Sequence, residues 1–339
     1  MAVDRVAVRS MGLGLPTRVI DNDTLVRRFG LTVDDAWIRS RTGVASRHWV
    51  SEGETTSDRA CRAVIAALET SGRSASDVER LLLATITPDR PSPSTATRVL
   101  HKAGLRCMAT DLSAACAGFL YALELGSALV RTGDRAVMIA AADVRSRFVN
   151  PTDRRSVVLF SDAAAAALLV PGDDPEAVAD VISVWCGAEG REDVGAWVPA
   201  GGAELPASEE TVRQGLHYVH LEPRNTVFEH FLRFASEAVE RALSAAGLSL
   251  SDIDWLVPHQ GNSFLVMETA KLLGFPLDRT LDRVANHGNS AGAALPVALV
   301  EAFADGTIRP GQTVLLVTAG AGHAFGSAVL RRRGVVGRP

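Results

Sequence analysis

The sequence contains the same pattern twice, and this internal repeat limits the fold more than any other feature. A first echo aligns the segment that begins at Ala66, AALETSGRSASDVERLL, with the segment that begins at Arg241, RALSAAGLSLSDIDWLV, at an offset of 175 residues. A second echo pairs the segment that follows Cys116, with its exit RTGDRAV, with Ala291 to Thr318, where the exit reads RPGQTV. Two echoes in the same order and at a similar offset predict a duplicated β/α unit.

The boundary between the two copies is predicted near the middle of the 339-residue chain. Residues 171–180, PGDDPEAVAD, have the Pro, Gly and Asp content of a linker. We therefore expect an N-terminal half over residues 1–174 and a C-terminal half over residues 175–339. The predicted strands are short and apolar, among them 136–142 and 157–160, as in sheets covered by helices on both faces. The expected fold class is α/β.

Composition excludes several classes of function. Hydrophobic residues make up 47% of the chain and charged residues 22%, which is typical of a globular protein. The net charge is −4 and no Lys/Arg run is present, so we expect no nucleic-acid partner. The longest apolar run, 163–170, is far short of the roughly 20 residues that span a bilayer, so no membrane association is expected. The N-terminus has no signal-peptide pattern and the four cysteines show no CxxC spacing, which favours a cytoplasmic protein.

Cys116 is the first candidate for chemistry. It lies between a predicted strand end at 111–113 and about five turns of predicted helix that end at Gly133. We place Cys116 in the first turn of that helix, where the helix dipole favours the nucleophilic thiolate. The alternative is that Cys116 packs as a small hydrophobic residue in the core.

Two polar turns in the second half supply possible partners for this thiol. His259 follows a predicted buried strand, and Asn289 precedes a predicted helix at 293–303. Because such positions converge at one end of an α/β sheet, a nucleophile, a base and a hydrogen-bond donor are expected to meet there. Taken singly, His259 also fits a core histidine, and Asn289 also fits a left-handed turn.

Three other motifs are weaker indications of a functional site. Trp37 with Arg39 and Arg41 fits a solvated surface or a site that stacks on an anionic aromatic ligand. The pair His217-x-x-His220 has no third ligand nearby, so no metal site is predicted. The glycine-rich segment 320–326 lies between two predicted strands, which fails the context of a dinucleotide loop. Its backbone N–H groups are suited to an oxyanion hole instead.

Several motifs together carry a family resemblance. They are Trp37-Ile-x-x-Arg41-Thr42-Gly43-Val44, Ala114-Ala-Cys116-Ala-Gly-Phe119, Pro151-Thr-Asp-Arg154, Pro258-His259-Gln-x-Asn262, His287-Gly-Asn289-Ser290 and Gly326-Ser327-Ala328. With these motifs the sequence resembles the β-ketoacyl-ACP synthase III enzymes, the initiating condensing enzymes of the thiolase superfamily, along essentially its whole length. The resemblance implies a thiolase-like duplicated αβαβα five-layered fold and a homodimer.

The resemblance also implies residue roles. Cys116, His259 and Asn289 match the family's catalytic triad, and the N–H groups of Cys116 and Ala321 would form the oxyanion hole. The implied reaction is ping-pong: acyl-CoA acylates Cys116, and a malonyl thioester then condenses with loss of CO₂. No cofactor is implied, since acyl-CoA is a substrate. The implied substrate-binding residues are Trp37, Arg41 and Arg154 for CoA, together with Asn262, Ser92 and Ala319.

Departures from the family pattern indicate a specialised member. The family's Gly-Asp-Gly-Ala-Gly-Ala is replaced by Ser161-Asp162-Ala163-Ala-Ala-Ala, and family aromatic residues are replaced by Ala319 and His323. Ser92 stands where some members carry a pocket-closing aromatic residue, so we expect a roomy acyl pocket. A role in polyketide priming therefore competes with fatty-acid initiation.

Two further readings stay open: an acyltransferase that moves the Cys116-bound acyl group to an O, N or S acceptor, and a non-catalytic partner subunit. Asn289 favours condensation over the first, because that donor matters chiefly for decarboxylation. The intact Cys116 argues against the second. The carrier is expected to be a dedicated acyl carrier protein or CoA itself, because Glu229, Phe264 and Leu272 replace basic residues at the family's docking positions.

Overall fold

A mixed sheet of nine strands forms the frame of the protein, in the order β11-β12-β13-β8-β1-β7-β6-β4-β5. The computed structural model describes residues 5–192, 195–221 and 224–334, and the side chains of these residues except 224–227. The two parts of the sheet are joined where β1 and β8 pair over three residues each. The first part comprises β1 (Val6–Leu13), β4 (Arg80–Ala84), β5 (Met108–Leu112), β6 (Val137–Val144) and β7 (Asp162–Pro171). The second comprises β8 (Ala179–Ala188), β11 (Trp255–Pro258), β12 (Thr313–Gly320) and β13 (Ala324–Arg332).

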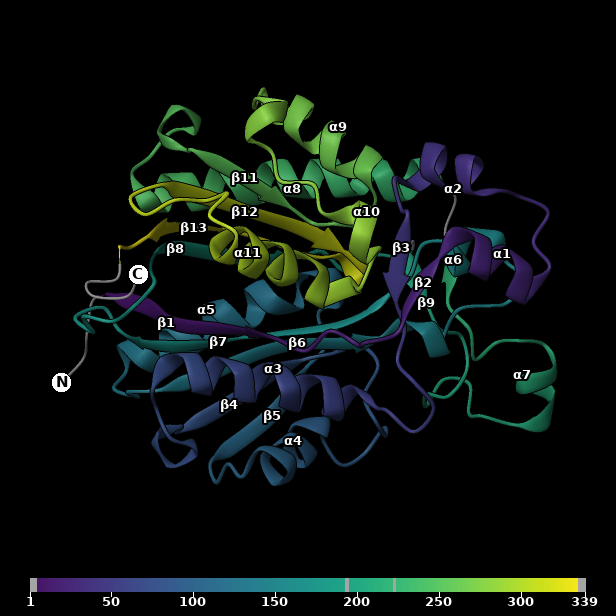
Figure 1. Cartoon of the computed structure of the whole chain (residues 1–339), viewed down its shortest axis with the longest axis horizontal. Helices are drawn as coiled ribbons and strands as arrows, with labels where there is room; N and C mark the ends of the chain where they lie inside the picture. The colour runs from purple at the N-terminus through teal and green to yellow at the C-terminus, as the bar shows by residue number, and fades with distance from the viewer. Residues whose placement is uncertain (1–4, 193–194, 222–223, 335–339) are drawn as a thin grey trace.

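Helices cover both parts of the sheet, and five layers result (Figure 1). On one outer face lie α3 (Thr56–Ser71) and α4 (Thr95–Ala103). In the middle layer, α5 (Gly118–Arg131) and α11 (Ala294–Ala304) contact strands of both parts. On the other outer face lie α8 (Arg224–Ala246) and α9 (Ser263–Leu273). The α/β class and the thiolase-like αβαβα arrangement predicted from the sequence are confirmed.

The alanine-rich strand β7 shows why both faces of the sheet are apolar. Its side chains alternate between two cores, since successive residues of a strand point to opposite faces. Ala163, Ala165 and Ala167 belong to the middle core with α5 and α11, whereas Ala164 and Ala166 belong to the outer core with α3. Small side chains on both faces bring the helix layers close to the strand.

The predicted repeat is visible in the backbone. Short 3₁₀ turns η1 (Ala75–Asp77) and η4 (Leu250–Asp252) occupy corresponding places, and each has the same Ser/Asp capping box. A second pair, η2 (Ala115–Ala117) and η6 (Ala291–Ala293), precedes the two central helices. Ala115 and Ala291, which begin these turns, have positive φ angles of 44° and 51°. Alanine rarely adopts this conformation, so both halves keep the same strained turn.

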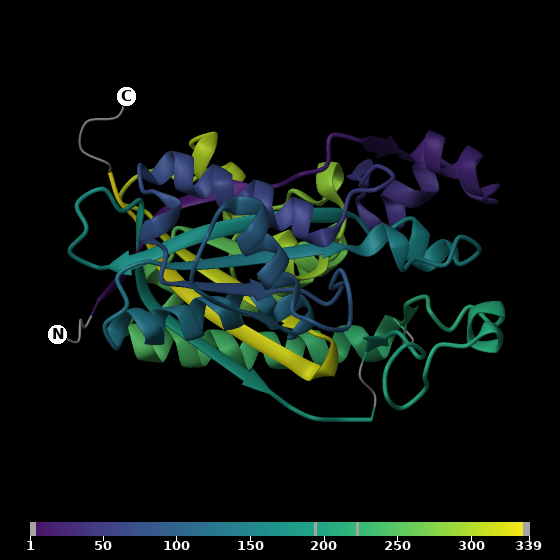
Figure 2. The ribbon, with the colours of Figure 1, turned by 90° about the horizontal axis from the view of Figure 1, so that it is seen from below.

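The remaining elements form a cap at the end of the molecule opposite the first residues of β1 (Figures 1 and 2). They include β2 (Val19–Asp21), α1 (Asn22–Phe29), α2 (Asp35–Thr42), β3 (Ser46–His48), η3 (Arg145–Arg147), α6 (Arg154–Val157), β9 (Ala196–Trp197), α7 (Glu209–Arg213), β10 (His220–Leu221), α10 (Val284–His287) and η7 (Ala321–His323). The turn η5 (Leu277–Arg279) lies elsewhere, beside β11, where Thr280 forms a bridge with Leu256. No helix in the described ranges is long and apolar enough to cross a membrane.

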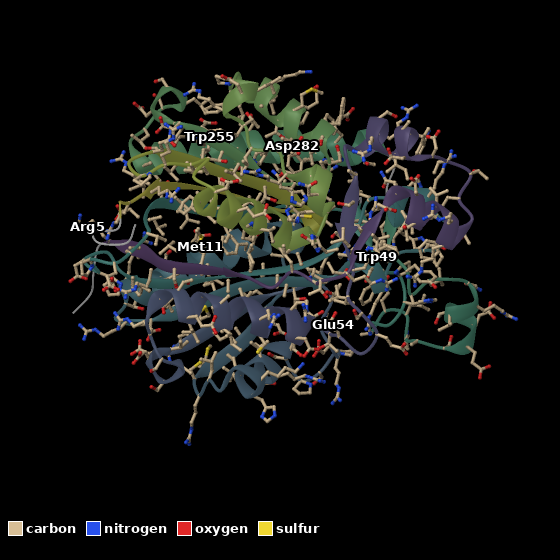
Figure 3. The ribbon with its side chains drawn as sticks, in the orientation of Figure 1. Arg5, Met11, Trp49, Glu54, Trp255 and Asp282 are labelled. Carbon is tan, nitrogen blue, oxygen red and sulfur yellow. The ribbon has the colours of Figure 1, made fainter. Side chains whose placement is uncertain are left out.

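The strand predicted at 157–160 is wrong. Val157 ends α6, and Phe160 forms only an isolated bridge with Asn289. Val157 and Phe160 are apolar because they pack into the core of the cap, where Trp49 also lies (Figure 3). Burial in a small core, and not strand pairing, therefore accounts for the apolar run.

Candidate active site

Cys116 lies in the turn η2, between the end of β5 and the start of α5. It is two residues before α5, not in the first turn of that helix as predicted. Its carbonyl accepts a hydrogen bond from Thr318 Oγ1 at 3.2 Å. Gly320 packs directly against it, since a Cβ there would lie 2.7 Å from the Cys116 amide nitrogen. The end of β12 therefore holds the nucleophile in place, and only glycine fits beside it.

The Cys116 thiol is not poised as a thiolate, contrary to the prediction. Cys116 keeps some exposed surface, but protein surrounds its sulfur, and this burial raises the pKa of the thiol to about 12. The positive charge of Arg145 opposes the rise, and Asp143 adds to it. Desolvation outweighs the nearby helix N-terminus here, because burial disfavours the charged form. The proton must therefore leave during acyl transfer.

His259 lies directly after β11, and its backbone N–H donates to the Val317 carbonyl of β12 at 2.9 Å. Its segment runs between Trp255 at the start of β11 and Asp282 before α10 (Figure 3). His259 is 2% exposed, and burial lowers its pKa to about 4. The imidazole is therefore neutral at physiological pH and can accept or donate one hydrogen bond through each nitrogen.

Asn289 is held by three hydrogen bonds that fix its orientation. Its backbone N–H donates to the Leu159 carbonyl and its carbonyl accepts from Ser161, both at 2.9 Å. Its side-chain Oδ1 accepts from the Ala291 N–H at 2.9 Å. Because Oδ1 is occupied, Nδ2 is the part of the amide that remains available as a donor.

The structure brings these three residues to one region. Strand β12 contacts both Cys116, through Thr318, and His259, through Val317. Turn η2 contacts η6, which follows Asn289, and it also contacts η7, which begins at Ala321. A thiol, a neutral imidazole and an oriented amide therefore line the end of the sheet where strands β11 and β12 stop.

The sequence reasoning missed two buried charged residues beside this region, Asp143 and Arg145. Asp143 is the last residue but one of β6 and is 1% exposed, and Arg145, just after the strand, is 4% exposed. Burial raises the pKa of Asp143 to about 6 and lowers the pKa of Arg145. Two charged residues at the end of an otherwise apolar strand were the signal that could have revealed them, since buried charges need an explanation.

The predicted CoA-binding residues lie in the cap. The Arg154 guanidinium carbon is 5.2 Å from the centre of a Trp37 ring, so α6 and α2 bring an aromatic surface and a cation together. Arg41 is exposed near the end of α2. Asn262 caps α9, because its side-chain oxygen accepts from the Leu265 N–H at 2.8 Å.

The two predicted pocket residues have different surroundings. Ser92 is exposed on the loop between β4 and α4, whereas Ala319 is 2% exposed on β12 and pairs with Phe325 of β13. The exposure of Ser92 and the burial of Ala319 do not show how large the acyl pocket is, so the roomy pocket stays a prediction.

Comparison with known proteins supports the family resemblance found in the sequence. The family described as 3-oxoacyl-[acyl-carrier-protein (ACP)] synthase III matches residues 110–190, and the C-terminal part of that family matches residues 243–332. The β-ketoacyl-[acyl-carrier-protein] synthase III of Roseiflexus castenholzii is 39% identical over 327 residues, which cover 96% of this chain and 97% of that protein.

Solved structures agree with the sequence relatives. The 3-oxoacyl-(acyl carrier protein) synthase III of Pseudomonas aeruginosa PAO1 superposes with a TM-score of 0.87 at 33% identity, covering 98% of this chain and 99% of that one. The priming β-ketosynthase of the R1128 polyketide pathway superposes with a TM-score of 0.85 at 25% identity, covering 98% of both chains. With identity near 40% across almost its entire length, the chain belongs to the β-ketoacyl-ACP synthase III family.

Proposed function

We propose that the protein is a condensing enzyme that loads an acyl group from acyl-CoA onto Cys116 and extends it with a malonyl thioester. In the loading step the Cys116 sulfur bonds to the acyl carbon, the carbon–sulfur bond to CoA breaks, and the thiol proton passes to the departing CoA sulfur. The N–H groups of Cys116 and Ala321 would stabilise the oxyanion. Neutral His259 is the nearby group that can relay the proton.

In the second step the malonyl thioester loses CO₂, and the resulting enolate attacks the acyl carbon on Cys116. The Cys116 sulfur leaves as a thiolate and takes a proton from water, which restores the thiol. His259 and Asn289 would donate hydrogen bonds to the thioester oxygen that becomes the enolate. A neutral imidazole suits this role, because an imidazolium would bind the malonyl carboxylate and oppose its loss.

The observation that carries the proposal is the fixed Asn289 amide. Its Oδ1 is held by the Ala291 N–H, which leaves Nδ2 as a donor, and burial keeps His259 at the same end of the sheet neutral. An acyltransferase without carbon–carbon bond formation needs no such second donor, which is why condensation is preferred to that alternative. The similarity to a polyketide-priming ketosynthase supports a specialised pathway as much as fatty-acid initiation. We further propose a cytoplasmic homodimer that needs no cofactor.

The test is intact-protein mass spectrometry after incubation with a panel of acyl-CoAs, followed by addition of malonyl thioesters. A mass gain that depends on Cys116, and that is released as a β-ketoacyl product only with the malonyl thioester, supports condensation. Release to an amine, alcohol or thiol without CO₂ formation would identify the acyltransferase. No acylation by any donor would favour the non-catalytic subunit.

A further inference from the structure

The side chain of Arg145 is a buried cation without a hydrogen-bonded acceptor. It is 4% exposed, and its Nε is enclosed without a partner. Across the described ranges, no residue forms an ion pair with its guanidinium or accepts a hydrogen bond from it. The guanidinium stacks on Phe160, whose ring centre lies 4.5 Å from the guanidinium carbon. Burying an unpaired charge is costly, so this arrangement calls for a function.

The two carboxylates that act electrostatically on Arg145, those of Asp143 and Asp162, accept hydrogen bonds from other residues. Asp143 and Asp162 both act on Arg145 electrostatically, yet in the part of the chain that the structure describes neither forms an ion pair with it. Neutral groups saturate them instead. Asp143 accepts from the N–H groups of Ile86 and Gly292 and from the hydroxyls of Thr85 and Thr87, and Asp162 accepts from the N–H groups of Val50 and Ser146 and the Ser146 hydroxyl. The guanidinium donors therefore remain available for a ligand.

Arg145 is also close to the nucleophile. After burial, its charge is the largest influence on the Cys116 thiol. Asp143, two residues earlier, binds the N–H of Gly292 in η6, and the space above Gly292 is bounded by the Ala115 carbonyl next to Cys116. Phe160, under the guanidinium, forms a backbone bridge with Asn289. Arg145 thus stands near the residues that surround Cys116.

We propose that Arg145 is a specificity-determining residue that binds an oxygen acceptor on the Cys116-bound acyl group, so that the preferred donor is a carboxyacyl-CoA. The inference rests on the function proposed above and names its donor. A guanidinium matches a carboxylate with two parallel N–H···O hydrogen bonds and supplies the pairing that Asp143 and Asp162 do not. Loading leaves the distal carboxylate unchanged: its carbon–oxygen bonds take no part in the thioester exchange.

The malonyl thioester is a less suitable ligand for this cation. Its carboxylate must depart as CO₂, and a buried positive charge bound to it would stabilise the reactant against that loss. The acyl donor keeps its carboxylate throughout, so pairing with Arg145 carries no such conflict.

The experiment compares donors of equal shape and different polarity. Succinyl-CoA and glutaryl-CoA are paired with 4-methylpentanoyl-CoA and 5-methylhexanoyl-CoA, in which an isopropyl group replaces the carboxylate. Acetyl-CoA serves as the reference donor. Single-turnover acylation of Cys116 is followed by intact mass spectrometry. We expect a carboxyacyl donor to load about ten- to a hundredfold more efficiently than its isopropyl counterpart, the range for a hydrogen bond to a charged group.

Variants separate recognition from an effect on the thiol. Arg145→Leu should reverse the donor preference, and Arg145→Lys should retain part of it. Arg147→Leu is the matched control, because Arg147 is two residues away and donates to the Glu54 carbonyl near the surface. It should leave the preference unchanged. Thermal unfolding of each variant shows whether it is folded.

Equal loss of loading for polar and apolar donors in Arg145→Leu would overturn the proposal, since it would show that Arg145 acts only on the thiol. A wild-type preference for the isopropyl donors would overturn it as well, even if Arg145→Leu failed to fold. If no donor, acetyl-CoA included, acylates Cys116 in the wild type, the proposed function itself fails. If acetyl-CoA loads and the carboxyacyl donors do not, only the present inference fails.

Discussion

The backbone N–H of Gly292 donates a hydrogen bond of 3.1 Å to Oδ2 of Asp143. This bond ties the end of β6 in the first half to the turn after Asn289 in the second half. Asp143→Asn should break it, because an amide has one oxygen where the carboxylate has two, and both Asp143 oxygens accept hydrogen bonds. We expect a loss of stability of about 1–3 kcal/mol and weaker condensation, measured by thermal unfolding and product formation.

Asp173→Asn is the control for that substitution, because Asp173 is exposed on the turn after β7. It should change neither quantity. An Asp143→Asn variant as stable and active as the wild type would show that the bond between the halves is dispensable.

The pH dependence of Cys116 alkylation distinguishes a buried thiol from a thiolate. With the pKa of the thiol raised to about 12 by burial, the thiolate fraction grows with pH throughout the range from 7 to 9. The rate of iodoacetamide modification, followed on the Cys116 peptide, should therefore rise about tenfold per pH unit without a plateau. A plateau at or below pH 7 would show that the helix N-terminus and Arg145 outweigh burial.

Asn289→Ala should separate the two half-reactions. Loading needs the nucleophile and the oxyanion hole, so the acyl-enzyme should still form. Condensation loses one donor aimed at the enolate, which we expect to cost about 10²–10³ in rate. Cys116→Ala, measured in parallel by mass spectrometry, should abolish loading. Equal loss of both steps in Asn289→Ala would contradict the separate roles.

Trp37 and Arg154 should act together on CoA. Trp37→Ala and Arg154→Ala are each expected to raise KM for acyl-CoA about fivefold or more, with little effect on kcat. The reason is that stacking and charge contacts there bind the CoA moiety and not the reacting acyl carbon. Arg155→Ala is the control, since Arg155 pairs with Asp153 at 3.1 Å. A change confined to kcat would place these residues in another role.

Binding to a generic acidic acyl carrier protein should be weak. Glu229 is exposed on α8, and Lys271 on α9 pairs with Glu268 at 2.8 Å, so Glu229 adds negative charge and the charge of Lys271 is already paired. Glu229→Lys should speed association, and this gain should shrink with added salt. Glu240→Lys makes the same charge change further along α8 and should have little effect. Tight, steeply salt-dependent binding by the wild type would contradict the prediction.

Local patterns predicted the elements that carry the chemistry. The ends of α3 (Thr56–Ser71) are marked by local sequence signals, because a Thr/Asp capping box opens the helix and a left-handed glycine, Gly72, closes it. His259 likewise follows a short buried strand and precedes a helix capped by Asn262. These signals lie within a few residues of the feature that they define.

Long-range packing decided what the sequence could not. The apolar run 157–160 suggested a strand, yet its partners are the core of the cap and not a neighbouring strand. The state of the Cys116 thiol depends on how completely other segments enclose it, and that enclosure is invisible in the local helix pattern. The position of Arg145 under the active site depends on where β6 ends relative to η2, which only the assembled sheet fixes.

Cys116 and Gly292 stand at corresponding places in the two halves, each one residue after an alanine of positive φ. A duplicated fold has two equivalent positions for a nucleophile, yet only the first half carries a cysteine there, and the second half carries Gly292. A Cβ at Gly292 would lie 3.0 Å from the Ala115 carbonyl oxygen, so a second thiol would push on the backbone that presents the first. The missing side chain at Gly292 therefore leaves room for the backbone that presents Cys116. The two halves of the duplicated fold are alike in backbone but unequal in chemistry.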